Sequence, residues 1–144
     1  RTLRRGFHAL VVRSFEYYED RESLFLILIK EAHRLCFSND VQKAAYFQDQ
    51  QQRLLDALVP AVQSAMAADD IVSLPPQPVA HMMLEVVHDL VVRRCLTDRS
   101  AVDGASCRPR PDAPLLHDPE AAADFLTSLL FDGLGASSTP AARS

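Results

Sequence analysis

Hydrophobic residues recur at three- and four-residue steps along most of this 144-residue chain, which is the period of an amphipathic α-helix. The pattern predicts a first helix over about residues 2–18. It also predicts a third, longer helix that follows a capping cluster at residues 38–40 and ends near Ala68. Pro60 lies inside the third helix and removes one backbone hydrogen bond, so we expect a kink there.

Between these two helices a second one is expected, with Asp20 as its N-cap and Cys36 close to its end. Its run Leu24–Ile29 reads LFLILI and is apolar on every side. A helix of this kind has to be covered on most of its surface. We therefore expect the second helix at the centre of the molecule.

The C-terminal part of the chain predicts two more helices. Pro78 suits the first turn of a fourth helix that reaches about Leu96. Residues 97–117 have no hydrophobic period and predict a long loop. The last helix has the clearest limits: Asp118 as N-cap with proline after it, and glycines at 133 and 135 that end it.

The helices account for almost all of the patterned sequence, and neither strands nor repeats are predicted. The expected fold is all-α, a bundle of about five to six helices. Residues 1–135 are expected to form one domain, and the small polar residues 136–144 a disordered tail. The chain begins at Arg1 within a helical pattern, so we expect it to be a fragment of a longer protein.

Composition narrows the possible functions. The net charge of −4 disfavours nucleic-acid binding by this chain itself, because that affinity depends on Lys and Arg. Three cysteines are too few for a disulfide framework and favour a cytoplasmic location. No apolar run approaches the roughly 18 residues of a membrane span, so no membrane partner is expected.

The last two helices are apolar on two sides each, which is more than a small domain can cover alone. The fourth helix has an ordinary core stripe and, opposite it, a mixed face with few charges. Two helices from each of two chains would form a four-helix bundle, so we expect a homodimer. Alternatively, the long loop predicted over residues 97–117 covers the second apolar faces of these two helices. The residues assigned to the dimer interface are His81, Leu84, Glu85, His88, Val92, Cys95, Phe125, Leu126, Leu129 and Leu130.

The order of elements resembles the C-terminal effector domain of TetR-family transcriptional repressors, over roughly residues 1–134. The resemblance is carried by FEYYED, RESLFLILIKEAHRL, QQQRLLDALVPAVQSAMAADDI, QPVAHMMLEVVHDLVVRRCL and DPEAAADFLTSLLFDGL. It implies a cytoplasmic homodimeric repressor that binds operator DNA through an N-terminal helix-turn-helix, which this chain lacks. It also implies that a small hydrophobic or aromatic effector, bound in the helical core, lowers the affinity of the repressor for operator DNA.

Several inward-facing side chains are candidates for contacts with such an effector between the first four helices. Gln51 lies on an apolar stripe, where a buried amide could orient a ligand. The candidate ligand-binding residues are Tyr17, Tyr18, Phe47, Gln51, Leu55, Leu58, Val62, Met82, Met83 and Val86. In the alternative, the apolar residues among them fill the core, Gln51 bonds a neighbouring side chain or reaches solvent, and the chain is a plain dimerisation module.

A metal-binding protein is a further alternative, because His81, Glu85 and His88 share one helical face. Three ligands on one helix do not readily enclose a metal, and no second cluster supplies the others. We therefore prefer to interpret them as polar groups at a dimer seam, and we expect no metal and no cofactor. The chain has no glycine-rich phosphate loop, nucleophile elbow or paired carboxylates with a supporting base, so we expect no enzymatic activity.

Overall fold

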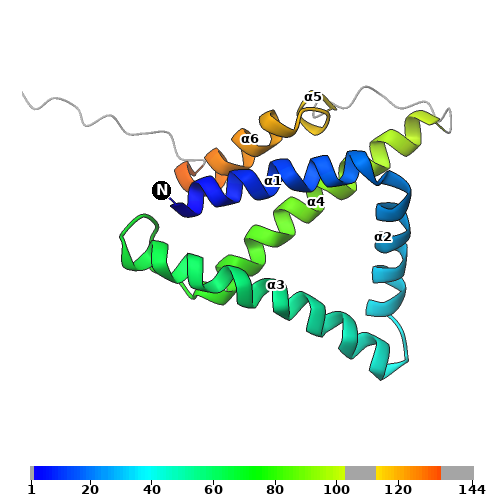
Figure 1. Ribbon diagram of the computed structural model, residues 1–144, viewed down its shortest axis with the longest axis horizontal. Helices are drawn as coiled ribbons and strands as arrows, with labels where there is room; N and C mark the ends of the chain where they lie inside the picture. The colour runs from blue at the N-terminus through cyan, green and yellow to red at the C-terminus, as the bar shows by residue number, and fades with distance from the viewer. Residues whose placement is uncertain (1, 103–112, 134–144) are drawn as a thin grey trace, which may run out of the picture.

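The computed structural model describes residues 2–102 and 113–133, and these ranges contain helices and no strands (Figure 1). The helices are α1 (Thr2–Asp20), α2 (Glu22–Cys36), α3 (Val41–Ala67), α4 (Pro76–Val102), α5 (Ala113–Leu116) and α6 (Pro119–Asp132). The prediction of an all-α chain of about five to six helices is confirmed, with α5 contributing a single turn.

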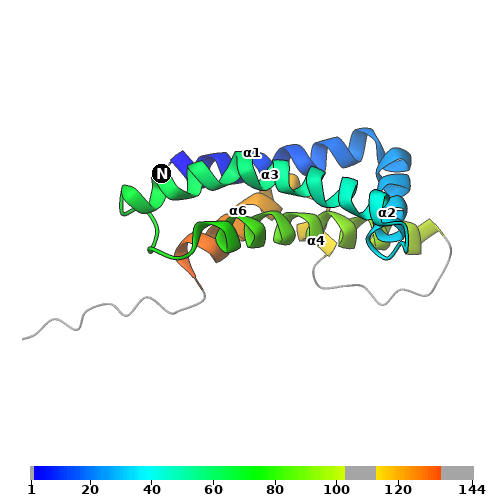
Figure 2. The same ribbon diagram turned by 90° about the horizontal axis from the view of Figure 1, so that it is seen from below.

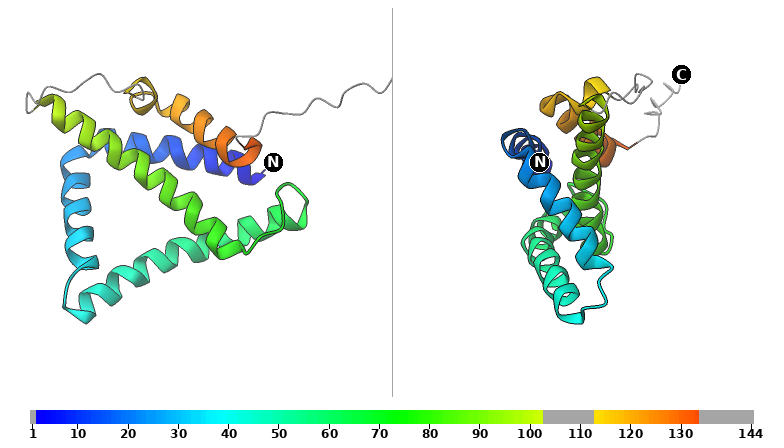
Figure 3. Two further views of the ribbon diagram at one scale, coloured as in Figure 1. Left: turned by 180° about the vertical axis from the view of Figure 1, so that it is seen from behind. Right: turned by 90° about the vertical axis from the view of Figure 1, so that its right-hand side faces the viewer.

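The helices lie in two layers, which are clearest when the molecule is seen from below (Figure 2). One layer contains α1 and α3, the other contains α4 and α6, and α2 runs across from one layer toward the other at one end of the molecule. Within this arrangement α1 runs alongside α6 and is crossed by α4. Helix α4 in turn packs against α3, and α2 connects α1 to α3 at the edge of the molecule (Figure 3). The described helices are too short or too polar for any of them to cross a lipid bilayer.

The core lies between α1, α3, α4 and α6. The buried stripe of α1 continues at three- and four-residue steps along its whole length, as an amphipathic helix requires. Two alanines of α6, Ala122 and Ala123, are completely buried. Side chains of this size let two helices approach closely. The stripe of α1 is Leu3, Phe7, Val11, Phe15 and Tyr18.

Two predicted N-caps are confirmed by hydrogen bonds. The Asp118 carboxylate accepts from the backbone N–H groups of Glu120 and Ala121, at 3.0 and 3.2 Å. Asp40 does the same for the first turn of α3. At the other end of α6, Gly133 has a φ of 76°, in the region that favours glycine. Gly135 and the predicted tail lie outside the described residues.

Three other predicted boundaries were wrong or incomplete. Asp20 remains within α1, and Arg21 precedes α2 without a side-chain cap. Helix α4 continues to Val102, six residues beyond the predicted end, and α5 lies within the segment predicted as loop. The extension of α4 has a tertiary cause, because the Tyr18 hydroxyl of α1 donates to Asp98 at 2.9 Å. Helix α3 continues through Pro60, and the kink there stays a prediction.

The expected central position of α2 was wrong. None of its residues is buried, and Leu24, Ile27 and Leu28 are 45%, 58% and 49% exposed. The helix lies at the edge of the molecule, where it connects α1 to α3 (Figure 1). Only one flank, with Phe25, packs against the core cluster. The apolar composition of α2 does not indicate how many other helices pack against it.

Candidate functional site

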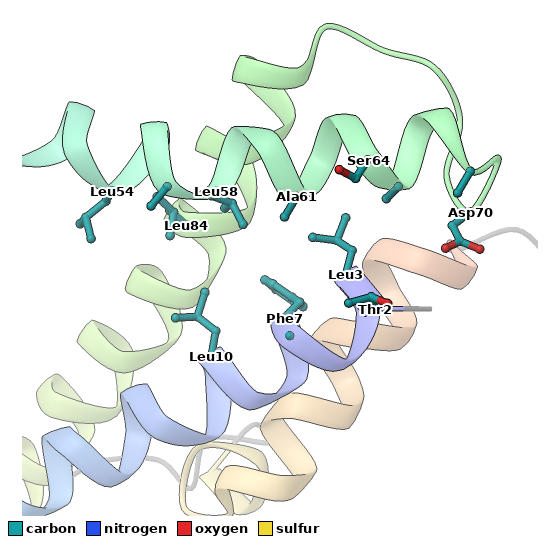
Figure 4. Close-up of a pocket in the computed structure, with 14 residues that line it drawn as sticks. Thr2, Leu3, Phe7, Leu10, Leu54, Leu58, Ala61, Ser64, Asp70 and Leu84 are labelled. Carbon is teal, nitrogen blue, oxygen red and sulfur yellow. The ribbon is translucent and has the colours of Figure 1, made fainter.

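An open cleft of about 670 Å³ lies between α1 and α3 (Figure 4). We call it the α1–α3 cleft. From α1, Leu3, Phe7 and Leu10 point toward the opposite wall. That wall is formed by α3, and Leu84 of α4 lies at the back. The residues of α3 that line the cleft are Leu54, Ala57, Leu58, Ala61, Ser64 and Ala65.

Small side chains on both walls keep the cleft open. On α3, alanine and serine occupy most of the positions past Leu58 that face α1. On α1, Gly6 lines the cleft, and a Cβ atom placed there would meet nothing within 4 Å. The two helices are therefore separated by a gap that their own side chains do not fill. Sequence periodicity marked these residues as inward-facing and could not show this gap.

A second hollow of about 330 Å³, the inner pocket, adjoins the α1–α3 cleft. Leu10, Leu54 and Leu84 line both. The inner pocket is bounded by α1, α2, α3 and α4, and it carries more polar groups. These groups are the side chains of Ser14, Gln51, His81, Glu85 and His88.

The polar groups of the inner pocket are only partly engaged by the protein. The Ser14 hydroxyl donates to the backbone carbonyl of Leu10 at 2.7 Å. His81 Nε2 lies 3.5 Å from Glu85 Oε1, one helical turn away. Gln51 and the two histidines are exposed at the rim. An apolar cavity with a few hydrogen-bonding groups at one end is typical of a site for a small organic molecule.

The predicted ligand-binding residues are divided among several places. Gln51 and Leu55 line the inner pocket, and Leu58 lines the α1–α3 cleft. Met82 and Met83 instead border a small hollow of about 110 Å³ next to α6. The remaining predicted residues line neither cavity: Tyr17, Tyr18, Phe47, Val62 and Val86.

Tyr18 has a structural role. Its side chain is completely buried, and its hydroxyl is bound to Asp98 of α4. Burial and this hydrogen bond raise the pKa of Tyr18 above the ordinary tyrosine value. Arg94 lies 5.3 Å from the Tyr18 ring and donates to Glu19 at 2.6 Å. This network joins the end of α1 to α4. Tyr17 is exposed beneath Arg21, so neither tyrosine faces a cavity.

The core stripe expected on α4 is buried at four positions, while several residues beside it lie on the other side from their assignment. The four buried residues are Met83, Val87, Leu90 and Val91. His81, Leu84 and His88, assigned to a dimer surface, line the inner pocket. Met82 and Val86, assigned to a pocket wall, line a groove between α4 and α6. Helical periodicity identifies two apolar faces, and only the position of α3 determines which of them turns inward. Cys95, also assigned to the dimer surface, is 3% exposed and belongs to the core.

The groove between α4 and α6, here called the α4–α6 groove, has a volume of about 410 Å³. Met82 and Phe125 are its most exposed apolar side chains, at 50% and 46%. Glu85, Asp89 and Arg93 add charges along its α4 side. The predicted interface residues Leu126 and Leu129 line it as well, while Val92 and Leu130 are half-buried elsewhere.

The alternative metal site is not assembled. Within residues 2–102 and 113–133, no three His, Cys, Asp or Glu side chains come together as ligands. His81 and Glu85 approach each other, but His88 does not complete a set with them.

No known family model, curated protein or solved structure matches this chain. The arrangement of its described residues defines a class, an all-α domain with a ligand-sized apolar cleft. The cleft and the surfaces around it are therefore the candidate functional sites of this chain.

Proposed function

We propose that this chain is the ligand-sensing and homodimerisation domain of a TetR-like transcriptional repressor. The observation that carries the proposal is the α1–α3 cleft of about 670 Å³, which adjoins the more polar inner pocket. The volume of the cleft and its mostly apolar lining are those expected of a site for a small hydrophobic or aromatic effector. The resemblance of the sequence adds the repressor context, with operator DNA bound by a helix-turn-helix ahead of α1.

Helix α1 is the part of the domain through which an effector would act. One side of α1 forms a wall of the cleft, and the buried stripe packs against α4 and α6. An effector that binds one position of α1 better than another shifts the population toward that position. A tenfold loss of operator affinity requires a difference of about 1.4 kcal/mol between the two affinities.

The first turns of α1 are also tied to α6. Both terminal nitrogens of Arg4 bind the Asp132 carboxylate, at 2.7 and 2.8 Å, and the same hydrogen bonds hold the pKa of Asp132 below its usual range. One turn later, His8 Nε2 lies 3.0 Å from Asp124. A displacement of α1 by a ligand would therefore be transmitted to α6.

Homodimerisation is assigned to the α4–α6 groove. Helix α6 has one face buried against α1, while Phe125 on another face remains accessible. Pairing two copies of this surface about a two-fold axis would bury Phe125 and Met82 of both chains. In such a dimer α4 lies between the ligand cavity and the interface, because it lines both the inner pocket and the groove.

A fluorescent apolar probe tests the ligand-sensing part of the proposal. N-phenyl-1-naphthylamine should bind the purified chain saturably, with one site per chain and a rise in emission. Gly6→Leu should abolish this binding, because the new side chain projects into open space in the cleft. Gly6→Ala, which adds only a methyl group, is the matched control and should still bind the probe.

The outcomes distinguish a ligand-sensing domain from a plain dimerisation module. Circular dichroism should show that Gly6→Leu keeps its helices, since leucine has a higher helix propensity than glycine. Absence of saturable binding to the unmodified chain, or equal binding to Gly6→Leu, would contradict the ligand-sensing function. A helix-turn-helix encoded directly upstream of Arg1 would support the repressor context.

A further inference from the structure

We propose that the ligand of the α1–α3 cleft and inner pocket is an elongated lipophilic cation. The inference rests on the proposed function only in requiring that this cavity binds a small molecule. Its apolar body would lie between α1 and α3, and its positive end beside a carboxylate at one end of the cavity.

The shape of the cavity determines the shape of the ligand. Leucines and alanines of α3 line it from Leu54 to Ala65, which corresponds to about 17 Å at the 1.5 Å rise per residue of an α-helix. Leu3, Phe7 and Leu10 of α1 face this row. A long, narrow apolar group fits such a lining better than a compact one.

The charges of the lining determine the charge of the ligand. Among the described residues, the charged side chains that line the two hollows are Asp70, at one end of the α1–α3 cleft, and Glu85, in the inner pocket. No Lys or Arg among the described residues lines either hollow. A positive group would therefore be attracted by the Glu85 carboxylate in the inner pocket, while a negative group would be repelled there.

The surroundings of Glu85 favour the inner pocket for the positive end. Its nearest described charge partner is the imidazole of His81, at 3.5 Å. Gln51 offers an amide oxygen, and Phe25 offers an aromatic ring in the same pocket. Carbonyl oxygens and aromatic faces both attract cations. Glu85 is half-exposed, so screening by solvent keeps the expected preference moderate.

Displacement of the naphthylamine probe by three ligands with the same ten-carbon tail tests the inference. The ligands are decyltrimethylammonium, decanol and decanoate, each kept below the concentration at which it forms micelles. The measurement is made at pH 8 in buffer of low ionic strength. We expect the cation to displace the probe at about fivefold lower concentration than decanol, and decanoate to be the weakest.

Variants without one of these charges identify the carboxylate that attracts the positive end of the ligand. Glu85→Gln removes the carboxylate from the inner pocket, and it should reduce the preference for the cation over decanol by half or more. Asp89→Asn removes the same charge from α4 on the side of the α4–α6 groove, and it should leave the preference unchanged. Taking the ratio of two ligands on each variant cancels general effects on folding or probe affinity.

The result that overturns this inference differs from the one that contradicts the proposed function. If the probe binds in a Gly6-dependent manner but decanol or decanoate displaces it as well as the cation does, only the cationic ligand is excluded. The same holds if Glu85→Gln leaves the preference unchanged. If the probe does not bind at all, the ligand-sensing function fails together with the inference.

Discussion

At the scale of single residues, Gly6 indicates that the α1–α3 cleft is not an incidental result of helix packing. Glycine in a helix is less stable than alanine by about 1 kcal/mol. No neighbouring atom requires a glycine there, because the space beside its Cα is open. A larger side chain would stabilise α1 and reduce the cleft at the same time, so stability and an open cavity oppose each other at this position.

Gly6→Ala should raise the free energy of unfolding by about 0.5–1 kcal/mol, because alanine restricts the unfolded chain and favours the helix. Urea denaturation followed by circular dichroism measures the change. Ala9→Gly, at an exposed position of the same helix, is the reverse control and should lower stability by a similar amount. A loss of stability in Gly6→Ala would mean that the cavity wall does not tolerate even a methyl group.

Tyr18 gives stability a dependence on alkaline pH. Its pKa is raised in the folded chain, so the folded state holds the phenolic proton more tightly than the unfolded state does. The resulting stabilisation is complete below the unfolded tyrosine pKa of about 10 and is lost as the pH rises above it. Tyr18→Phe should therefore flatten the decline of unfolding free energy between about pH 10 and 11.

The control for this prediction is Tyr17→Phe, since Tyr17 is exposed and its neighbour is buried. Its decline with pH should match that of the unmodified chain. Equal slopes for Tyr18→Phe and the unmodified chain would show that the bond to Asp98 is not what links stability to alkaline pH.

At the scale of elements, the described helices differ in what supports them. The ends of α3 and α6 are fixed locally, by Asp40 and Asp118 and by the pattern of the few residues around them. Helix α2 has a more apolar sequence than α1 or α3, yet none of its residues is buried. Its hydrophobic side chains contact neighbours on one flank only, so they contribute little to the stability of a single chain.

Alanine substitutions measure this difference. Ile27→Ala in α2 should reduce the free energy of unfolding by less than about 0.5 kcal/mol, because a half-exposed side chain loses few contacts. Phe15→Ala in α1 should reduce it by about 3–5 kcal/mol, because that ring is completely buried. Thermal or urea unfolding of both variants tests the comparison. A cost at Ile27 close to that at Phe15 would indicate that α2 is covered, for example by a second chain.

At the scale of the whole molecule, the two layers present different surfaces. The layer of α1 and α3 encloses the ligand-sized cleft, and the layer of α4 and α6 carries the exposed groove (Figure 2). Helix α4 belongs to both sites, since His88 lines the inner pocket and Asp89, the next residue, lines the groove. A ligand and a partner chain would thus contact neighbouring faces of one helix, and Glu85 lines both hollows.

Phe125→Asp should convert the proposed dimer to single chains, because a carboxylate cannot be buried at the centre of an apolar interface without a partner. Sedimentation velocity at micromolar concentration should give twice the mass of the chain for the unmodified protein and the single mass for the variant. Leu28→Asp, at an equally exposed position of α2, is the matched control and should remain dimeric. A single mass for the unmodified protein would exclude the α4–α6 dimer.

The sequence alone determined the helical class, the N-cap at Asp118 and the capping cluster at residues 38–40. These features depend on hydrogen bonds and periodicity within a few residues, so they can be recognised locally. It also placed Gln51, Leu55 and Leu58 on the correct side of α3.

Only the tertiary structure decided the position of α2, the direction of each face of α4 and the place of the cleft. Each of these depends on contacts between segments far apart in the chain, such as Arg4 with Asp132 or Tyr18 with Asp98. A period of 3.6 residues gives a helix its faces but does not say which neighbour covers them. An empty space between two helices has no sequence pattern of its own, because it is made by side chains that are small and neighbours that stay apart.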